Sequence, residues 1–297
     1  MILILKSLLV GLAHYIFLSL ATIFCSTLIV SMFPFKLIGR MLGREQIISQ
    51  IIRRFYLLWI DFQYLGRIIF TKTNLQVELP PGLSLDKSYL IVSNHISWVD
   101  IPIIVQATRG KVPPSIFFIK HEIIYLPFAG LAAWCCDMIF LKRYTKKQMD
   151  KNPELRGKDL VTAKEKCERF RNMPTSVINF SEGTRFTVEK HEKTKSKFDH
   201  LLNPKVGGVS FIVNAMHPQI SEILDVTIAY ESSDKLLFKY LTGQMKNIRV
   251  YIKSIPINSD WIGNYEEDLE YRAKTKEKMH RIWLEKDQLL EKNITQA

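Results

Sequence analysis

The sequence has few cysteines, and they follow no pattern that would make them a structural framework. Only four occur in 297 residues, and two of them, Cys135 and Cys136, are adjacent. Small disulfide-stapled secreted domains carry cysteines at a much higher density, so that class is excluded. The chain contains no C-x-x-C pair, which excludes a cysteine-rich zinc site, and we expect no metal. It also has no internal repeat and no low-complexity tract.

Acidic residues are the scarcer of the two charge types. The chain has 41 Lys and Arg residues against 29 Asp and Glu residues, a formal net charge of +12. This excess predicts an anionic partner, and composition alone leaves nucleic acid, a membrane surface and a phosphorylated substrate open. Hydrophobic residues make up 47% of the chain and charged residues 24%, so intrinsic disorder is excluded. The length suits one catalytic-sized domain with an appendage, or two small domains.

Lysine, arginine, aspartate and glutamate are missing altogether from residues 7–33. A helix of this length is roughly 40 Å long, more than the roughly 30 Å hydrocarbon core of a bilayer requires. We therefore predict a membrane anchor that ends at Pro34. The alternative is a cleaved signal peptide. The length of the apolar stretch, the single Lys6 before it and the lack of a small-x-small cleavage site argue against that alternative.

Basic residues follow the predicted anchor, and they set its expected orientation. They are Lys36, Arg40, Arg44, Arg53 and Arg54. By the positive-inside rule, the bulk of the chain then faces the cytoplasm from the inner (cytoplasmic) membrane. Residues 47–70 interleave basic and aromatic side chains, which suits either an interfacial helix on anionic lipid or an amphipathic helix packed on the rest of the protein. We interpret residues 1–70 as a two-helix membrane module that either spans the bilayer or dips into one leaflet.

The remaining chain, residues 71–297, alternates short apolar runs with segments of helical character after a Leu-Pro-Pro-Gly turn at residues 79–82. The predicted strands are Tyr89–Val92, Ser115–Ile119, Met138–Leu141, Ser176–Phe180, Val226–Tyr230 and Ile248–Ile252. The predicted helices include Ile101–Thr108, Lys158–Arg171, Val209–Met216 and a charge-dense C-terminal helix within Glu266–Asn293. This alternation predicts an α/β domain whose central sheet is covered on both faces.

A histidine and an aspartate directly follow the first of these strands. The strand delivers His95 at its carboxyl end, where ligands of open α/β sheets bind. Asp100 comes five residues later, and in a continuous helix the two side chains would be about 140° apart, so they meet only if the chain between them turns. Given that turn, Asp100 holds one imidazole nitrogen while the other takes a proton. The alternative is a histidine that is merely hydrogen-bonded at a strand end.

The segment FSEGTRFT, residues 180–187, follows another predicted strand. Gly183 allows the backbone to approach a ligand closely. Arg185 offers a planar fork that suits phosphate oxygens, and Thr184 is a further donor. The alternative is a turn in which Glu182 and the arginine form a surface ion pair.

Both segments resemble sequence blocks of one family. NHISWVD (residues 94–100) and FSEGTRFT resemble the first and third blocks of the PlsC-like glycerolipid acyltransferases, with the NHxxxxD and EGTR signatures intact. FFIKHEI (residues 117–123) is similar to the family's strand-end lysine segment, and MIFLKR (residues 138–143) to its second block. The segment around residues 201–230 resembles the YihG-type branch, with Thr227 where the best-known bacterial enzymes have proline. The resemblance covers about residues 85–255.

The resemblance implies a fold and a reaction. The fold is a mixed central sheet flanked by helices, and the reaction moves a fatty acyl group from acyl-CoA or acyl carrier protein to the free hydroxyl of 1-acyl-glycerol-3-phosphate. No cofactor beyond the acyl donor is expected. A hydroxyl attacks a thioester only when a base removes its proton, which assigns His95 as base and Asp100 as its partner. The acceptor phosphate is expected at Glu182, Gly183, Thr184 and Arg185 and, by resemblance to the second block, at Arg143.

Other residues have weaker expected roles. Lys120 and backbone N–H groups near the strand ends are candidates for stabilising the oxyanion. Lys205 and the adjacent Gly207 and Gly208 suggest another phosphate-facing turn, whereas His121 and the cysteine pair are predicted to be structural.

The sequence leaves two alternative functions open. One is acylation or transacylation of another lysophospholipid. The other is a non-catalytic membrane protein that binds anionic lipid through its net charge. No base-stacking or groove-reading motif is present, so nucleic acid is not an expected partner.

Overall fold

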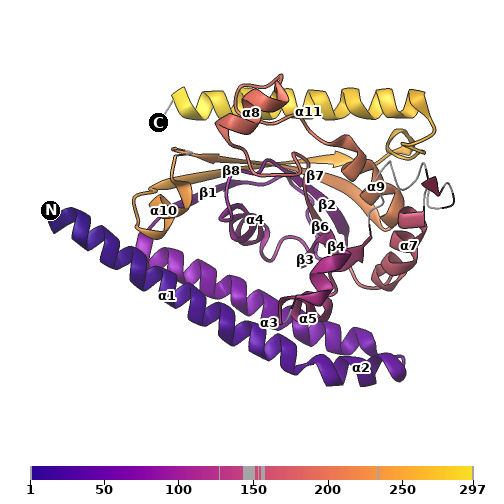
Figure 1. Cartoon of the computed structure of the whole chain (residues 1–297), viewed down its shortest axis with the longest axis horizontal. Helices are drawn as coiled ribbons and strands as arrows, with labels where there is room; N and C mark the ends of the chain where they lie inside the picture. Colours follow the sequence, from indigo (N-terminus) through magenta and orange to yellow (C-terminus); the bar gives the residue numbers. More distant parts are fainter. Residues whose placement is uncertain are drawn as a thin grey trace.

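The chain begins with a helical hairpin. The computed structural model describes residues 2–126, 128–142, 151–152, 154, 158–232 and 234–295. Helices α1 (Ile2–Ser31) and α2 (Phe33–Met41) follow each other with one residue between them, and α3 (Glu45–Gly66) turns back along α1 (Figure 1). A short π-helical turn, η1 (Arg67–Thr71), extends α3.

The first helix ends close to the predicted place, since α1 stops at Ser31, three residues before Pro34, but a second helix follows almost at once. Pro34 lies in the first turn of α2, where the N–H that proline lacks would have no intrahelical partner in any case. The chain reverses only near Gly43, which adopts a positive φ of 66°. Within the described residues, one helical stretch, Ile4–Met41, is long and apolar enough to cross a membrane by length and composition.

Helix α3 packs on the rest of the protein. Ile60 is fully buried in a cluster that includes α4 (Asp100–Thr108). The Arg53 guanidinium donates hydrogen bonds of 2.8 Å and 2.5 Å to the carbonyl and hydroxyl oxygens of residues 174–175. Of the two interpretations of residues 47–70, the packed amphipathic helix is therefore confirmed, and contact with lipid stays a prediction.

A six-stranded sheet forms the centre of the fold, in the order β1-β8-β7-β2-β6-β3. Its strands are β1 (Asn74–Glu78), β2 (Ser88–Ser93), β3 (Ser115–Ile116), β6 (Ser176–Phe180), β7 (Ile220–Tyr230) and β8 (Asn247–Pro256). All neighbours are parallel except β7 and β8, so the sheet is mixed, as expected. A second, two-stranded parallel sheet joins β4 (Phe118–Lys120) to β5 (Ile139–Leu141).

Two strand predictions need correction, and one strand was missed. The run Ser115–Ile119 is divided between β3 and β4, which belong to different sheets because the chain leaves the main sheet at Phe117. Strand β7 begins at Ile220, six residues before the predicted start, because pairing with β8 carries it past polar positions. Strand β1 was not predicted at all, since its five residues are half exposed and carry little apolar signal.

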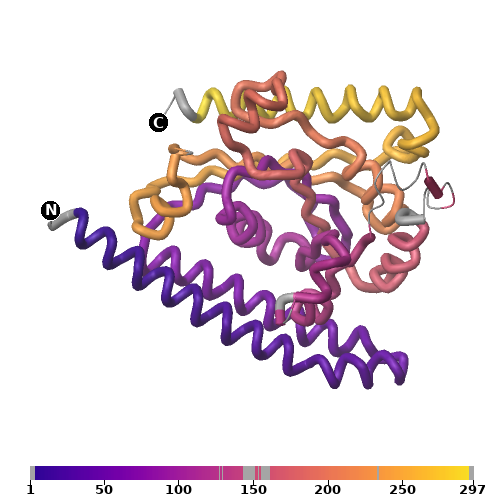
Figure 2. Tube along the Cα trace, viewed as in Figure 1, coloured from indigo at the N-terminus to yellow at the C-terminus, as the bar shows by residue number. Residues whose placement is uncertain are grey.

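Helices cover both faces of the sheet, as expected. Among the described residues, the further helices are α5 (Ala129–Cys135), α7 (Lys158–Cys167), α8 (Val188–Thr194), α9 (Val206–Met216), α10 (Leu236–Leu241), α11 (Leu269–Thr295) and the 3-10 turns η2 (His121–Tyr125), η4 (Glu168–Phe170) and η5 (Ser259–Trp261). In β2, Leu90 and Val92 pack in the cluster with α9 and α11, whereas Tyr89 and Ile91 pack in the cluster with α4. The first and last helices of the chain therefore lie on opposite sides of the sheet (Figure 2).

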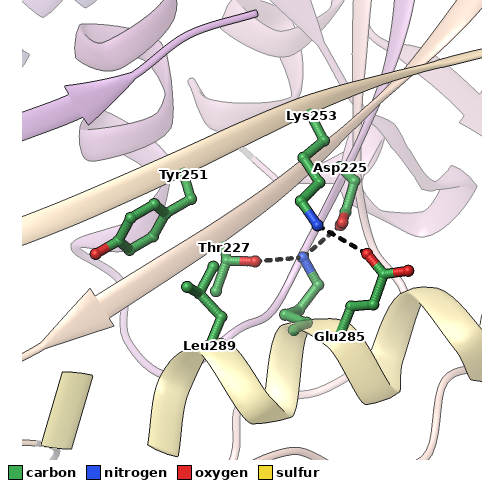
Figure 3. A pocket seen from close by; sticks show the side chains of 7 residues that line it. Asp225, Thr227, Tyr251, Lys253, Glu285 and Leu289 are labelled. Carbon is green, nitrogen blue, oxygen red and sulfur yellow. Dashed lines mark hydrogen bonds and ion pairs between the residues drawn. The ribbon is translucent and has the colours of Figure 1, made fainter. Parts of the chain in front are cut away.

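Helix α11 is attached to the sheet by a buried lysine. The Lys286 ammonium group donates hydrogen bonds to Asp225 Oδ1 at 2.6 Å, to the Val226 carbonyl oxygen at 2.6 Å and to Thr227 Oγ1 at 3.1 Å. Figure 3 shows this small polar pocket between the helix and β7, with an outer ion pair between Lys253 and Glu285 beside it. The charge-dense C-terminal helix is thus held to the sheet by a charged side chain inside the protein.

Candidate active site

The chain turns between His95, the predicted base, and Asp100, its predicted partner, as their pairing requires. His95 follows β2 and Asp100 begins α4, and His95 Nδ1 lies 2.8 Å from Asp100 Oδ2. The same carboxylate oxygen accepts the backbone N–H groups of Ile96 at 2.6 Å and Ser97 at 2.9 Å. The turn is therefore built around the carboxylate, which explains why the five-residue spacing brings the two side chains together.

Two further side chains, from other strands, fix this pair. The Phe180 ring, at the end of β6, stacks on the imidazole with 4.0 Å between centroids and an angle of 17°. The Tyr230 hydroxyl, at the end of β7, donates to Asp100 Oδ1 at 2.6 Å. Asp100 is 1% exposed, whereas the imidazole remains partly exposed. With Nδ1 held by the carboxylate, Nε2 is the ring nitrogen that can exchange a proton with a substrate.

Asn94 holds the same turn against β7. Its side-chain amide donates to the Ile228 carbonyl oxygen at 3.0 Å, and its side-chain oxygen accepts the Ile228 N–H at 2.9 Å. The asparagine of the NHxxxxD pattern therefore takes the place of a backbone residue in the sheet ladder.

The placement of Glu182 corrects its predicted role as a phosphate-binding residue. Its side chain is 1% exposed, and its two oxygens accept the backbone N–H groups of His95 at 2.9 Å and Leu202 at 3.0 Å. A buried carboxylate with both oxygens occupied repels a phosphate. Burial raises the pKa of Glu182 to about 7, although the two backbone donors and the charge of Lys286 act in the opposite direction. Glu182 thus ties the EGTR turn to the histidine loop.

Cationic side chains gather around the rest of the EGTR turn. Gly183 has φ 71°, and a Cβ there would lie 2.7 Å from the Lys205 ammonium, so glycine leaves room for that lysine. The Arg185 guanidinium lies 4.8 Å from the centre of the Trp98 ring, and both side chains are exposed. Lys190 donates to Thr184 Oγ1 at 2.8 Å and to the Arg185 carbonyl oxygen at 2.9 Å. These cations can bind an anionic group at the rim where His95 is exposed.

The other predicted residues lie in other parts of the fold or outside the described residues. Lys120 ends β4 in the small second sheet with its side chain exposed, and Arg143 lies outside the described residues. Burial raises the pKa of the Cys135 thiol to about 11, which agrees with the predicted structural role. Within the described ranges, no group of three or more His, Cys, Asp or Glu residues could hold a metal ion.

Sequence reasoning missed several of the contact residues. They are Asn94, Trp98, Phe180, Lys190 and Tyr230. The first three lie inside the recognised motifs without an assigned role. A signal for Tyr230 was available, because it ends a strand beside β2 and a polar group at that position faces the same sheet edge.

The structure thus brings an oriented imidazole and exposed cations together at one rim of an α/β sheet, an arrangement suited to acid–base chemistry on an anionic substrate. A family model described as Acyltransferase matches residues 68–231, which is more than half of the sequence. The chain belongs to this acyltransferase family.

Individual relatives agree with this assignment. The chain is 27% identical over 218 residues to 1-acyl-sn-glycerol-3-phosphate acyltransferase 3 of Arabidopsis thaliana, covering 67% of this chain and 55% of that protein. It is 25% identical over 189 residues to 1-acyl-sn-glycerol-3-phosphate acyltransferase delta of Homo sapiens, covering 60% and 45%. The chain thus spans about half the length of these curated relatives.

The crystal structure of the 1-acyl-sn-glycerophosphate (LPA) acyltransferase PlsC from Thermotoga maritima has a similar fold. The TM-score is 0.52 at 20% identity, and the match covers 93% of this chain and 94% of that one. The expected glycerolipid acyltransferase fold is confirmed, and the YihG-type branch stays a prediction.

Proposed function

We propose that this protein is a membrane-bound O-acyltransferase that transfers a fatty acyl group from an acyl thioester to 1-acyl-glycerol-3-phosphate, giving phosphatidic acid. The observation that carries this proposal is the oriented pair of His95 and Asp100, with 2.8 Å between Nδ1 and Oδ2, on the rim that also holds Arg185. The names of the relatives support the acceptor. Acyl-CoA and acyl carrier protein are the two candidate donors.

The proposed reaction uses the imidazole twice. His95 Nε2 removes the proton of the acceptor hydroxyl while the hydroxyl oxygen attacks the thioester carbonyl carbon. Asp100 stabilises the imidazolium that forms. When the tetrahedral intermediate collapses, the carbon–sulfur bond breaks, and the thiolate leaving group takes the proton from the imidazolium. No nucleophile from the protein is needed.

The acceptor phosphate binds to the exposed cations in this proposal. Arg185 lies on the indole of Trp98, which keeps its planar fork at the rim, and Lys205 crosses the turn at Gly183. Arginine forks bind phosphate oxygens in pairs, and lysine adds a point charge. Lys120 and Arg143 stay proposed contributors to binding the oxyanion or the phosphate.

The hairpin is the proposed membrane attachment. Helix α1 exposes many large apolar side chains, among them Leu5, Leu9, Leu12, Leu20 and Ile23. Contact with an anionic membrane would remove this apolar face from water and bring the basic protein close to negative charge, so membrane binding is favourable. We propose that the sheet and its active site lie on the cytoplasmic side of the inner membrane.

The test is turnover of labelled lysophosphatidic acid by membranes that contain the full chain, with acyl-CoA and acyl carrier protein donors in parallel. We expect His95→Ala to lower the rate of phosphatidic acid formation roughly 10²- to 10⁴-fold, the range for loss of a general base. His280→Ala, an exposed histidine on α11, is the matched control and should leave turnover unchanged.

Unchanged turnover in His95→Ala would contradict the mechanism. Product formed only from other lysophospholipids, as seen by mass spectrometry, would correct the acceptor. Binding to anionic lipid that weakens with salt, with no acyl product from any acceptor, would favour the non-catalytic alternative.

A further inference from the structure

The carboxylate of Asp100 is held from two sides. Oδ2 accepts one imidazole N–H and two backbone N–H groups, all from its own loop. Oδ1 accepts its hydrogen bond from Tyr230, which lies 130 residues further along the chain. The loop contacts alone would allow the carboxylate to pivot about Oδ2, so the tyrosine supplies the second fixed point.

Tyr230 is well suited to serve as that fixed point. It is the last residue of β7, and β7 pairs with β2, the strand that delivers His95. The ring is 7% exposed and packs in the cluster shared by β2, β7 and α4. Burial and the neighbouring carboxylate raise the pKa of Tyr230 well above its ordinary value, so the phenol stays protonated and acts as a donor.

A donor at this position has two physical consequences. It fixes the rotation of the carboxylate, which keeps Oδ2 aligned with His95 Nδ1. It also supplies a hydrogen bond to a charge that is almost completely removed from water, where a lost partner leaves a costly unsatisfied oxygen. Because the donor is neutral, it does not cancel the negative charge that stabilises the imidazolium.

We propose that Tyr230 is a positioning residue of this acyltransferase, whose hydroxyl holds the carboxylate of Asp100 in the orientation that serves His95. The role in turnover rests on the proposed function. The effect on the imidazole–carboxylate hydrogen bond does not, so it can be tested separately.

The kinetic experiment compares Tyr230→Phe with Tyr89→Phe in the full chain. Tyr89, on β2, is the matched control, because it is also a buried tyrosine with a hydrogen-bonded hydroxyl. In its case the hydroxyl oxygen accepts the Ser84 N–H at 2.9 Å. We expect Tyr230→Phe to lower kcat about ten- to a hundredfold and to leave the KM for acceptor and donor within about twofold. Tyr89→Phe should keep kcat while losing similar thermal stability.

The spectroscopic experiment needs no substrate. The proton between His95 Nδ1 and Asp100 is observed by ¹H NMR in detergent and assigned by its loss in His95→Ala. We expect this resonance to shift or broaden in Tyr230→Phe and to stay unchanged in Tyr89→Phe. An unchanged resonance in Tyr230→Phe overturns the proposal, as does a fall in kcat that is equal in the two variants. If wild type turns over no acceptor, the proposed function fails, and the resonance alone decides the role of Tyr230.

Discussion

Buried carboxylates in the active site and at the helix attachments are held in different ways. In the active site, Asp100 and Glu182 take their hydrogen bonds from backbone N–H groups, an imidazole and a phenol. At the attachments, Asp137 and Asp225 each bind a buried lysine, with 2.6 Å between nitrogen and oxygen in both cases. All four side chains are nearly inaccessible to water.

The two attachments resemble each other closely. Lys36 of α2 also donates to the Cys135 carbonyl oxygen at 2.7 Å, and Lys286 of α11 to the Val226 carbonyl oxygen at 2.6 Å. Each ammonium lies 5.4 Å from the centre of a tryptophan ring. The hairpin and the C-terminal helix are thus fastened by the same type of contact.

The difference follows from what each carboxylate has to do. A lysine in direct contact offsets most of the negative charge of the carboxylate, so the pair serves mainly to hold two elements together, although the Lys286 ammonium still acts on Glu182. Neutral donors stabilise a carboxylate and leave its net charge in place. The charge of Asp100 can therefore act on His95, whereas the charge of Asp225 is paired with Lys286 and holds α11 in place.

The largest expected effect comes from breaking an attachment. Lys286→Met leaves Asp225 buried without its cation, and removing one partner of a buried pair destabilises a protein by about 3–5 kcal/mol. The free energy of unfolding in detergent, measured by denaturant titration, should fall by this amount. Lys253→Met is the matched control, since its ion pair with Glu285 lies nearby but is exposed, with side chains 59% accessible.

A double variant distinguishes the loss of the charge pair from the loss of packing by the lysine side chain. The double variant Asp225→Leu with Lys286→Met should recover most of the loss, because a neutral apolar pair has no unpaired charge. A loss in Lys286→Met no greater than in Lys253→Met would show that the buried pair is not what fastens α11.

The second prediction concerns the active-site group. Burial raises the pKa of Glu182 from 4.5 to about 7, so the folded protein binds this proton more tightly than the unfolded chain does. The stabilisation is therefore complete below pH 4.5 and is lost as the pH rises to 7. This rise in pKa corresponds to about 3 kcal/mol.

The measurement compares wild type with Glu182→Gln, which cannot titrate at this position. Between pH 4.5 and pH 8, the free energy of unfolding of wild type should fall relative to that of the variant, by about 3 kcal/mol in total. Contributions from other titrating groups cancel in this difference. Parallel pH curves would show that the backbone donors and Lys286 offset the burial of Glu182 completely.

The sequence was sufficient to predict the pairing of His95 with Asp100, because the whole turn lies within seven residues. The contacts that hold the turn come from elsewhere. Glu182 was predicted to face phosphate because its motif looks like a ligand loop, but its oxygens bind backbone groups of residues 95 and 202, which only tertiary folding brings near. Tyr230 was missed for the same reason.

The same holds for the fold: elements with a clear local sequence pattern were predicted, and elements without one were not. The buried strand β2 was predicted almost to its ends, since a strand covered on both faces is a continuous apolar run. Helix α2 was not predicted, because Pro34 is tolerated in a first helical turn and local sequence does not distinguish that from a helix end. The edge strand β1 could not be predicted in this way, because its five residues form no continuous apolar run.

The smallest expected effect completes the comparison with an exposed pair between two helices. Arg109 Nε and Nη2 donate to the two oxygens of Asp61 on α3, at 2.5 Å and 2.6 Å, with side chains 36% and 47% exposed. The geometry is as good as that of the buried pairs, but water screens the charges. A double-mutant cycle with Arg109→Ala and Asp61→Ala should therefore give a coupling energy of about 0–1 kcal/mol. At roughly 1 M salt, where the Debye length is about 3 Å, the coupling should shrink further. A coupling as large as the loss in Lys286→Met would mean that hydrogen-bond geometry, and not burial, sets the strength of these attachments.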